Sequence, residues 1–251
     1  MPETTPTATP AVSVVVPVRN EAENVRLLAD EIAAALNGRW NFELIYVNDG
    51  SADATEQVLR ELKFERPYLR QIKHAMSCGQ SAAVRSGVAA ARAPLVATLD
   101  GDGQNDPSFI PALLHAFEQG GAGIGLAAGQ RVGRHGAAKK FQSSIANSVR
   151  SAILRDGTRD SGCGLKVFQR DAFWALPYFD GLHRFLPALF RRDGYAIAYV
   201  DVVDRSRGHG VSNYGMWDRL WVGILDLMGV WWLLRRKKRV PQVSEGSNDA
   251  R

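Results

Sequence analysis

The chain has 251 residues, 45% of them hydrophobic and 23% charged, which suits one large α/β domain with a sizeable core. Its net charge of +5 is that of one basic run, Arg-Arg-Lys-Lys-Arg at 235–239, so the rest of the chain is formally neutral. This distribution excludes the basic face of a nucleic-acid-binding protein. The two cysteines exclude a disulfide framework and favour a reduced, cytosolic setting.

The first half of the chain alternates short apolar runs with longer amphipathic stretches. The apolar runs predict strands at 12–16, 42–47, 69–73 and 95–99. The stretches between and after them predict helices that open at Asn20, near Thr55, at Gly79 and at Pro107. This alternation is typical of an α/β fold with a mostly parallel sheet flanked by helices.

The second half is less regular. It predicts a strand near 124–128, a helix over 137–154, short strands at 165–168 and 196–202, and a last helix over 216–234. Residues 1–10 lack the apolar segment of a secretory signal and predict a disordered leader. The expected organisation is a main domain over 11–215, a helix with the basic cluster over 216–239, and a disordered tail over 240–251.

Polar clusters follow three of the predicted strands, at 17–21, 48–53 and 100–104. Ligands of parallel α/β sheets bind beyond the carboxyl ends of the strands, so these clusters predict one shared site.

The third cluster, Asp100-Gly-Asp102-Gly-Gln104, places two carboxylates and an amide after a buried strand. Hard oxygen ligands of this kind suit Mg²⁺ or Mn²⁺, which bridge phosphate oxygens. The alternative interpretation is a polar turn that caps the next helix, which Asp106-Pro107 already provides for. In the second cluster, Asp49 and Asp53 are candidates for hydrogen bonds to a base or ribose, or for a helix cap.

Several motifs occur in a fixed order and together resemble a known family. They are Val-Val-Pro17-Val-Arg-Asn20-Glu21, Asn48-Asp49-Gly-Ser-Ala-Asp53, Gly79-Gln80-Ser-Ala-Ala, Asp100-Gly-Asp102-Gly-Gln104-Asn-Asp-Pro107, Asp160-Ser-Gly-Cys-Gly-Leu-Lys166 and Arg207-Gly-His-Gly-Val-Ser212-Asn213-Tyr-Gly215. The series resembles glycosyltransferase family 2 enzymes of the dolichyl-phosphate mannose synthase type, including bacterial undecaprenyl-phosphate sugar transferases. The resemblance covers about 12–234. It departs from the family at Asn48, where Asp is frequent, and at Asn213, where Lys is usual.

The resemblance implies a GT-A fold, with 11–215 as the catalytic domain, and a UDP- or GDP-sugar donor. It implies nucleotide-sugar-binding residues Pro17, Asn20, Glu21, Asp49, Asp53, Gln80, Asp100 and Arg207. It implies metal ligands Asp100, Asp102 and Gln104, and catalytic residues Asp100, Asp102, Arg131 and Asp160. For the acceptor phosphate it implies Arg131, Arg134, Ser143, Ser144 and Ser212.

The implied reaction is inverting transfer of a sugar to a polyprenyl phosphate such as undecaprenyl or dolichyl phosphate, in cell-envelope glycan biosynthesis. A phosphate monoester is already an anion at neutral pH, so it needs little help from a general base. A glycan, lipid or protein hydroxyl acceptor would need such a base, and it remains an alternative. A non-catalytic scaffold of a membrane complex is another alternative. A nucleotidyltransferase is disfavoured because no glycine-rich basic loop follows the first strand.

The stretch 220–234 is mostly apolar, carries three tryptophans and precedes the basic run. Its fifteen residues fall short of the roughly 20 that span a bilayer. The pattern favours a helix in the headgroup region of an anionic membrane, on a peripheral enzyme at the cytoplasmic face. A core-packing helix is the alternative. A membrane-protein partner or a homo-oligomer also fits an apolar helix.

Overall fold

The computed structural model describes residues 9–132, 150, 153–205 and 216–236, and within 216–222 it describes the backbone alone. Residues 1–8 of the leader expected over 1–10, the whole tail expected over 240–251 and most of the helix expected over 137–154 lie outside these residues.

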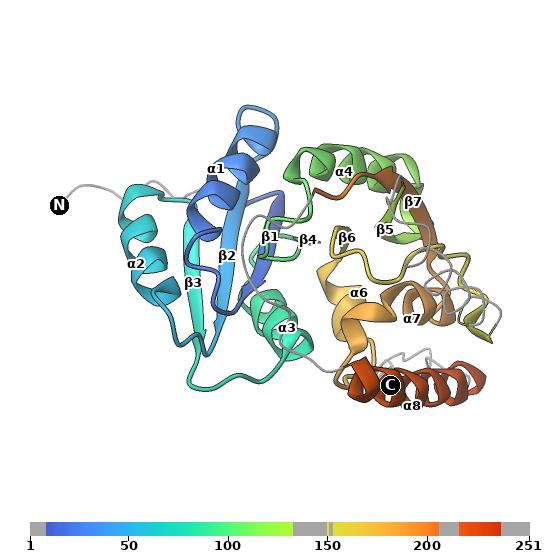
Figure 1. Cartoon of the computed structure of the whole chain (residues 1–251). Coiled ribbons are helices and arrows are strands. Elements are labelled where there is room, and N and C mark those ends of the chain that lie inside the picture. The colour runs from blue at the N-terminus through green and yellow to red at the C-terminus, as the bar shows by residue number, and fades with distance from the viewer. Residues whose placement is uncertain (1–8, 133–149, 151–152, 206–215, 237–251) are drawn as a thin grey trace, which may run out of the picture.

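A seven-stranded sheet organises the chain, with strand order β3-β2-β1-β4-β6-β5-β7 (Figure 1). Only β6 runs antiparallel to its neighbours among these strands, and the other pairs are parallel. The predicted mostly parallel sheet is therefore confirmed. The strands are β1 (Val12–Val18), β2 (Phe42–Asp49), β3 (Leu69–His74), β4 (Leu95–Thr98), β5 (Ile124–Arg131), β6 (Lys166–Gln169) and β7 (Ala196–Val202).

Helices cover both faces of the sheet and define two hydrophobic layers. One layer packs β-strand side chains such as Val14 and Val16 against α1 (Val25–Leu36), α2 (Thr55–Glu65) and α4 (Ile110–Gln119). The other layer packs Val15 and Ile45 against the helices on the opposite face. These are α3 (Gln80–Ala90), α6 (Arg170–Trp174), α7 (Leu186–Arg192) and α8 (Met216–Arg235). Because both faces are covered, β1 and β2 are buried along nearly their whole length.

Four differences from the predicted elements have local causes. Helix α1 begins at Val25, because Asn20 takes a left-handed backbone (φ 57°) and a turn intervenes. Strand β1 continues through Pro17 to Val18. Strand β5 runs on to Arg131, because its backbone pairs with β7 as far as Arg131 and Val202. The short helices α6 and α7 were not predicted, because their aromatic-rich stretch shows no clear period.

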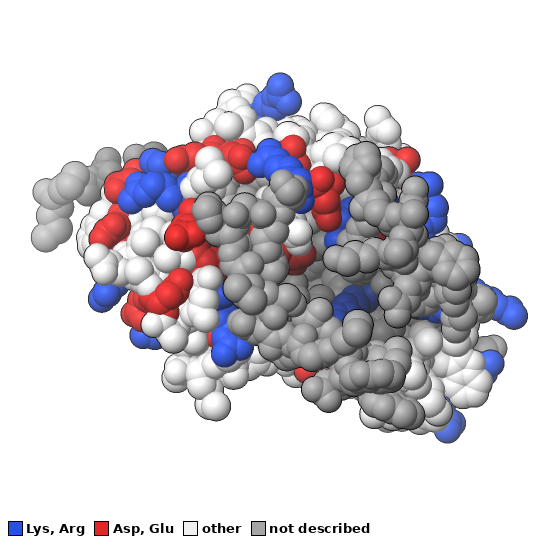
Figure 2. Space-filling model, in the orientation of Figure 1, with Lys and Arg blue, Asp and Glu red and all other residues white. Residues whose placement is uncertain are grey.

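The last helix forms over Met216–Arg235, close to the predicted bounds. Its inward side includes Val230, which is buried, and Leu227, which packs on the second layer. No helix in the described part of the chain has both the length and the apolar character needed to cross a bilayer. On the face drawn in Figure 2, basic side chains are interspersed with acidic ones over the described residues, as the balanced charge predicts.

Candidate active site

The polar strand ends lie together at the carboxyl edge of the sheet. The Asn20 N–H donates to Ser51 Oγ at 3.0 Å, and Asn20 Oδ1 accepts from Ala52 N at 2.8 Å, which joins the first two clusters. Gln80, at the start of α3, donates through Nε2 to Asp100 Oδ1 at 2.7 Å, which joins α3 to the third cluster. The residues predicted to converge from three strands therefore do so.

A pocket of about 200 Å³ opens at this edge. Its walls come from the end of β1, the start of α3, the end of β4, the loop before β6, and the segment that leads into α7. The lining residues are Pro17, Gln80, Val84, Thr98, Leu99, Asp100, Ser161, Gly162, Cys163, Gly164, Lys166, His183, Arg184 and Leu186.

Asp100 is tightly packed in the wall of this pocket. Its backbone N–H donates to Asn105 Oδ1 at 2.9 Å, and Gly164 approaches so closely that a Cβ there would lie 2.6 Å from Asp100 Cγ. Burial raises the pKa of Asp100, and the neighbouring charge of Asp102 raises it further, while Lys166 and the hydrogen bond from Gln80 oppose the shift. Two carboxylates that repel one another in this way form an environment that a cation relieves.

The donor set at this turn fits a divalent cation. Asp100 and Asp102 supply carboxylate oxygens, and Gln104 supplies an amide oxygen within the same turn. Asp102 Oδ1 also accepts from the Gln104 N–H at 3.1 Å, which fixes the turn. Such all-oxygen sets suit Mg²⁺ or Mn²⁺.

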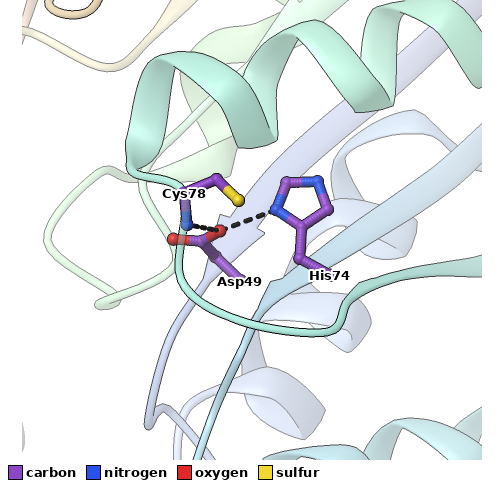
Figure 3. A group of neighbouring side chains, drawn as sticks. All are labelled: Asp49, His74 and Cys78. Carbon is purple, nitrogen blue, oxygen red and sulfur yellow. Dashed lines mark hydrogen bonds and ion pairs between the residues drawn. The ribbon is translucent and has the colours of Figure 1, made fainter.

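Asp49 organises the loop after β3 (Figure 3). Its Oδ1 accepts from Cys78 N at 2.8 Å and contacts His74 Nδ1 at 2.7 Å, while its Oδ2 accepts from Ser77 Oγ at 2.8 Å and Gly79 N at 3.0 Å. Burial alone would raise the pKa of Asp49, but these hydrogen bonds together lower it. The carboxylate thus holds the loop from which Gln80 reaches Asp100.

A carboxylate oxygen of Asp49, a ring nitrogen of His74 and the sulfur of Cys78 all lie within 4.8 Å of one another. Hydrogen bonds account for this proximity, because both carboxylate oxygens of Asp49 already accept two each and His74 Nε2 contacts Ser86 Oγ at 2.9 Å. We therefore assign the trio to the architecture of the loop. A contact between Asp49 and a nucleotide stays a prediction.

The other predicted nucleotide-binding residues have identifiable local contacts. Asp53 Oδ1 accepts at 3.0 Å from the backbone N–H of Thr55, the first residue of α2, and Asp53 Oδ2 accepts from Ala22 N at 3.3 Å. The Glu21 N–H donates to Thr55 Oγ1 at 2.9 Å. Asp53 and Glu21 therefore position the first strand end, while Pro17 lines the pocket itself.

Arg131, at the end of β5, is held by two carboxylates. Its Nε and Nη2 both bind Asp160, the latter at 2.8 Å, and its Nη1 binds Asp204 Oδ2 at 3.1 Å. Burial alone would lower the pKa of Arg131, but these carboxylates raise it. Asp204 Oδ1 accepts in turn from Asn105 Nδ2 at 3.2 Å, and Asn105 holds Asp100. A chain of contacts thus joins Arg131 to the turn at residues 100–104, which we call the metal turn after its predicted ligands.

This arrangement brings the predicted catalytic residues Arg131 and Asp160 together and favours a bracing role for both. Binding of an acceptor phosphate by Arg131 stays a prediction. The remaining predicted residues, Arg134, Ser143, Ser144, Arg207 and Ser212, lie outside the described part of the chain.

Residues 183–184 and Asp204 belong to the site but received no role from the sequence. His183 Nδ1 contacts Ser81 Oγ at 2.8 Å, and burial lowers its pKa to about 3, with the charges of Arg184 and Lys166 adding to the effect. A histidine before a short helix gives no recognisable signal. In the sequence, Asp204 could be recognised only as the first residue of a loop. Cys163 is buried and burial raises its thiol pKa to about 11, which suits a residue that packs in the wall of the pocket.

Comparison with known proteins decides the family. A family model described as "Glycosyl transferase family 2" matches residues 13–176. The chain belongs to glycosyltransferase family 2. It is 36% identical over 235 residues to dodecaprenyl-phosphate galacturonate synthase of Rhizobium johnstonii, covering 90% of this chain and 68% of that protein. It is 31% identical over 206 residues to undecaprenyl-phosphate 4-deoxy-4-formamido-L-arabinose transferase of Pseudomonas fluorescens, covering 81% of this chain and 60% of that protein. The chain thus spans about two thirds or less of these relatives.

Solved structures share the fold of this family-2 glycosyltransferase. Glucosyl-3-phosphoglycerate synthase from Mycobacterium tuberculosis, in complex with Mn²⁺, UDP-glucose and glycerol 3-phosphate, superposes with a TM-score of 0.67 at 21% identity, covering 90% of this chain and 80% of that one. A mannosyltransferase from Pyrobaculum calidifontis, in complex with GDP-Man and Mn²⁺, gives 0.66 at 21% identity, covering 94% and 67%. The predicted family and the GT-A fold are confirmed.

Proposed function

We propose that this family-2 glycosyltransferase moves a sugar from a UDP- or GDP-sugar to a polyprenyl phosphate, with inversion at the sugar carbon. The observation that carries the proposal is the carboxylate turn of Asp100 and Asp102 beside a pocket at the carboxyl edge of the sheet. The named relatives act on dodecaprenyl and undecaprenyl phosphate, and this supports the acceptor class.

A divalent metal, Mg²⁺ or Mn²⁺, is part of the proposal. Asp102, Gln104 and Asp100 would hold it, and when bound it would neutralise the oxygens of the donor diphosphate and so favour its departure. The repulsion between the two carboxylates and the all-oxygen donor set support this assignment. The Mn²⁺ complexes of the structural neighbours support it further.

The chain's own residues would orient both substrates. Gln80 and Asn105 fix Asp100 from two sides, through contacts of 2.7 and 2.9 Å. Arg131 ties the loop that carries Asp160 to Asp204, and this holds the side of the site from which the acceptor would approach. Because the phosphate nucleophile is already an anion, positioning can supply much of the rate acceleration without a general base.

We propose that the protein works as a peripheral enzyme at the cytoplasmic face of the membrane, with 11–215 as its catalytic domain and 216–239 as the part that meets the lipid. Helix α8 leaves a stripe of apolar side chains exposed, and its basic run follows directly. Arg235 stacks on Trp231, with its guanidinium carbon 3.6 Å from the ring centroid. The stripe consists of Ile224, Leu225, Met228, Trp231 and Trp232.

The test is nucleoside diphosphate release by purified protein with Mn²⁺ or Mg²⁺ and a panel of UDP- and GDP-sugars. Matched reactions contain undecaprenyl phosphate, undecaprenol or no acceptor. We expect release from one donor that rises only with undecaprenyl phosphate. Stimulation by undecaprenol would assign a hydroxyl acceptor, and the absence of any turnover would support a scaffold.

A further inference from the structure

The pocket beside Asp100 is placed to receive the sugar of the donor. In the proposed function the donor diphosphate lies on the metal held by Asp100 and Asp102, and the sugar is bonded to that diphosphate. The ring must therefore lie next to Asp100, where the pocket opens. Val84, Thr98 and Leu186 also line the pocket. Its volume of about 200 Å³ suits a sugar, which ends there, better than a polyprenyl chain, which has to continue.

One cation of this pocket is buried with no carboxylate of the described residues in direct contact, and the charges of Asp100 and Asp160 act on it from a distance. Lys166 is only 4% exposed, and its Nζ donates to the backbone carbonyl of Cys163. No carboxylate forms an ion pair with it in the described part of the chain. Burying an ammonium group is costly unless it is paired, so this lysine favours an anion nearby.

Arg184 is a second cation that lines the same pocket. Arg184 is exposed, and within the described ranges its guanidinium makes neither a hydrogen bond nor an ion pair. Asp226 of α8 acts on it through its charge, yet forms no ion pair with it. This contrasts with Arg131, whose guanidinium is taken up by Asp160 and Asp204. His183, with its lowered pKa, adds no charge at neutral pH.

We propose that this pocket selects a donor whose sugar bears a carboxylate, that is, a nucleotide-activated hexuronate. Lys166 and Arg184, which both line the pocket, bind this carboxylate together. The inference rests on the proposed function for the place of the donor. Charge-assisted hydrogen bonds discriminate well, because a neutral CH₂OH group would leave both cations without their anion.

The test is donor binding by calorimetry in the presence of Mn²⁺ and in the absence of any lipid. The probes are matched pairs: UDP-galacturonate with UDP-galactose, UDP-glucuronate with UDP-glucose, and GDP-mannuronate with GDP-mannose. We expect the wild-type protein to bind one uronate at least tenfold more tightly than its neutral partner. Arg184→Gln should remove most of this preference and change the affinity for the neutral sugar less than twofold.

Two further variants complete the design. Lys166→Met should also remove the preference if it folds, and Arg60→Gln, an exposed arginine on α2, should leave it unchanged. A wild-type protein that binds neutral and acidic sugars equally, or favours the neutral one, would overturn the inference. So would an Arg184→Gln variant that keeps the full preference for the uronate. Because no lipid is present, a uronate preference without lipid transfer would retain this inference and refute the proposed function alone.

Discussion

Arg131 and Asp160 form a two-pronged ion pair across 29 residues of chain. Both side chains are nearly buried, with 12% and 10% of their surfaces exposed. Asp204, which follows β7, accepts a hydrogen bond from Arg131 through Oδ2 and another through Oδ1 from Asn105, which directly follows the metal turn. The pair therefore joins the loop that carries Asp160 to the turn that carries the predicted metal ligands.

We expect Arg131→Ala to lower both stability and transfer rate. Its removal leaves two partly buried carboxylates without a cation, which costs about 3 kcal/mol or more. The matched control is Arg26→Ala, whose ion pair with Glu65 is exposed, with 44% and 45% of the side chains accessible, and therefore contributes little to stability. Urea unfolding measures both variants. Equal losses of stability in the two variants would contradict the bracing role.

Gly164 gives a second prediction, because its lack of a side chain makes room for Asp100. A Cβ there would lie 2.5 Å from Asn105 Oδ1 and 2.6 Å from Asp100 Cγ. We expect Gly164→Ala to weaken Mn²⁺ binding and to cost about 1–3 kcal/mol of stability through overpacking. The control is Gly123→Ala, where a Cβ meets nothing within 4 Å. If Mn²⁺ affinity is the same in both variants, Asp100 does not serve the metal turn.

The lowered pKa of His183 predicts that the protein loses stability in weak acid. Burial lowers the folded pKa of His183 from 6.5 to about 3, with Arg184 and Lys166 contributing, so between these values the unfolded chain binds a proton that the folded chain does not. The free energy of unfolding therefore falls as pH falls from 6.5 toward 3, by up to about 1.4 kcal/mol per pH unit for this one proton.

Urea unfolding from neutral pH down to pH 4.5 would measure this dependence. We expect His183→Gln to flatten the curve, and His115→Gln, whose side chain is 61% exposed, to leave it steep. A His183→Gln curve that parallels the wild type would refute the assignment.

The basic run predicts salt-dependent membrane binding. Replacing residues 235–239 with five glutamines should reduce binding to vesicles of anionic lipid, because each basic residue near such a surface contributes about 1 kcal/mol. Cosedimentation at low and high salt measures the effect, which should shrink at high salt. Trp232→Ala, which shortens the apolar stripe, should lower binding at both salt concentrations. Binding that is unaffected by either change would exclude α8 as the membrane contact.

The strands were predictable because the buried strands carry short apolar runs, as at Val14–Val18 in β1. The position of the polar turn that carries Asp100 and Asp102 was predictable because it follows such a strand, while their role as metal ligands stays a prediction. The start of α1 was not predictable, since the left-handed backbone of Asn20 depends on contacts with Ser51 and Ala52, which are distant in sequence.

The pairing of Arg131 with Asp160 and Asp204 lay equally beyond sequence patterns. It depends on how the end of β5 meets the loop before β6 and the segment after β7 in space. Residue spacing along the chain does not indicate such contacts. The same holds for Lys166 and Arg184, which reach one pocket from β6 and from the segment before α7. The sequence therefore indicated Asp100, Asp102 and Arg131 as site residues but assigned no role to Lys166 or Arg184.

The most direct test of the account is recovery of a lipid-linked sugar from purified protein, Mn²⁺, undecaprenyl phosphate and the nucleotide-sugar that it binds. Mass spectrometry of the organic extract identifies the product, and Asp102→Asn serves as the matched variant, with urea unfolding as the control for folding. We predict a glycosyl phosphate lipid from the wild type and at least a hundredfold less from a folded Asp102→Asn. A wild type that binds donor and metal yet yields no lipid product, or a fully active Asp102→Asn, would contradict the account.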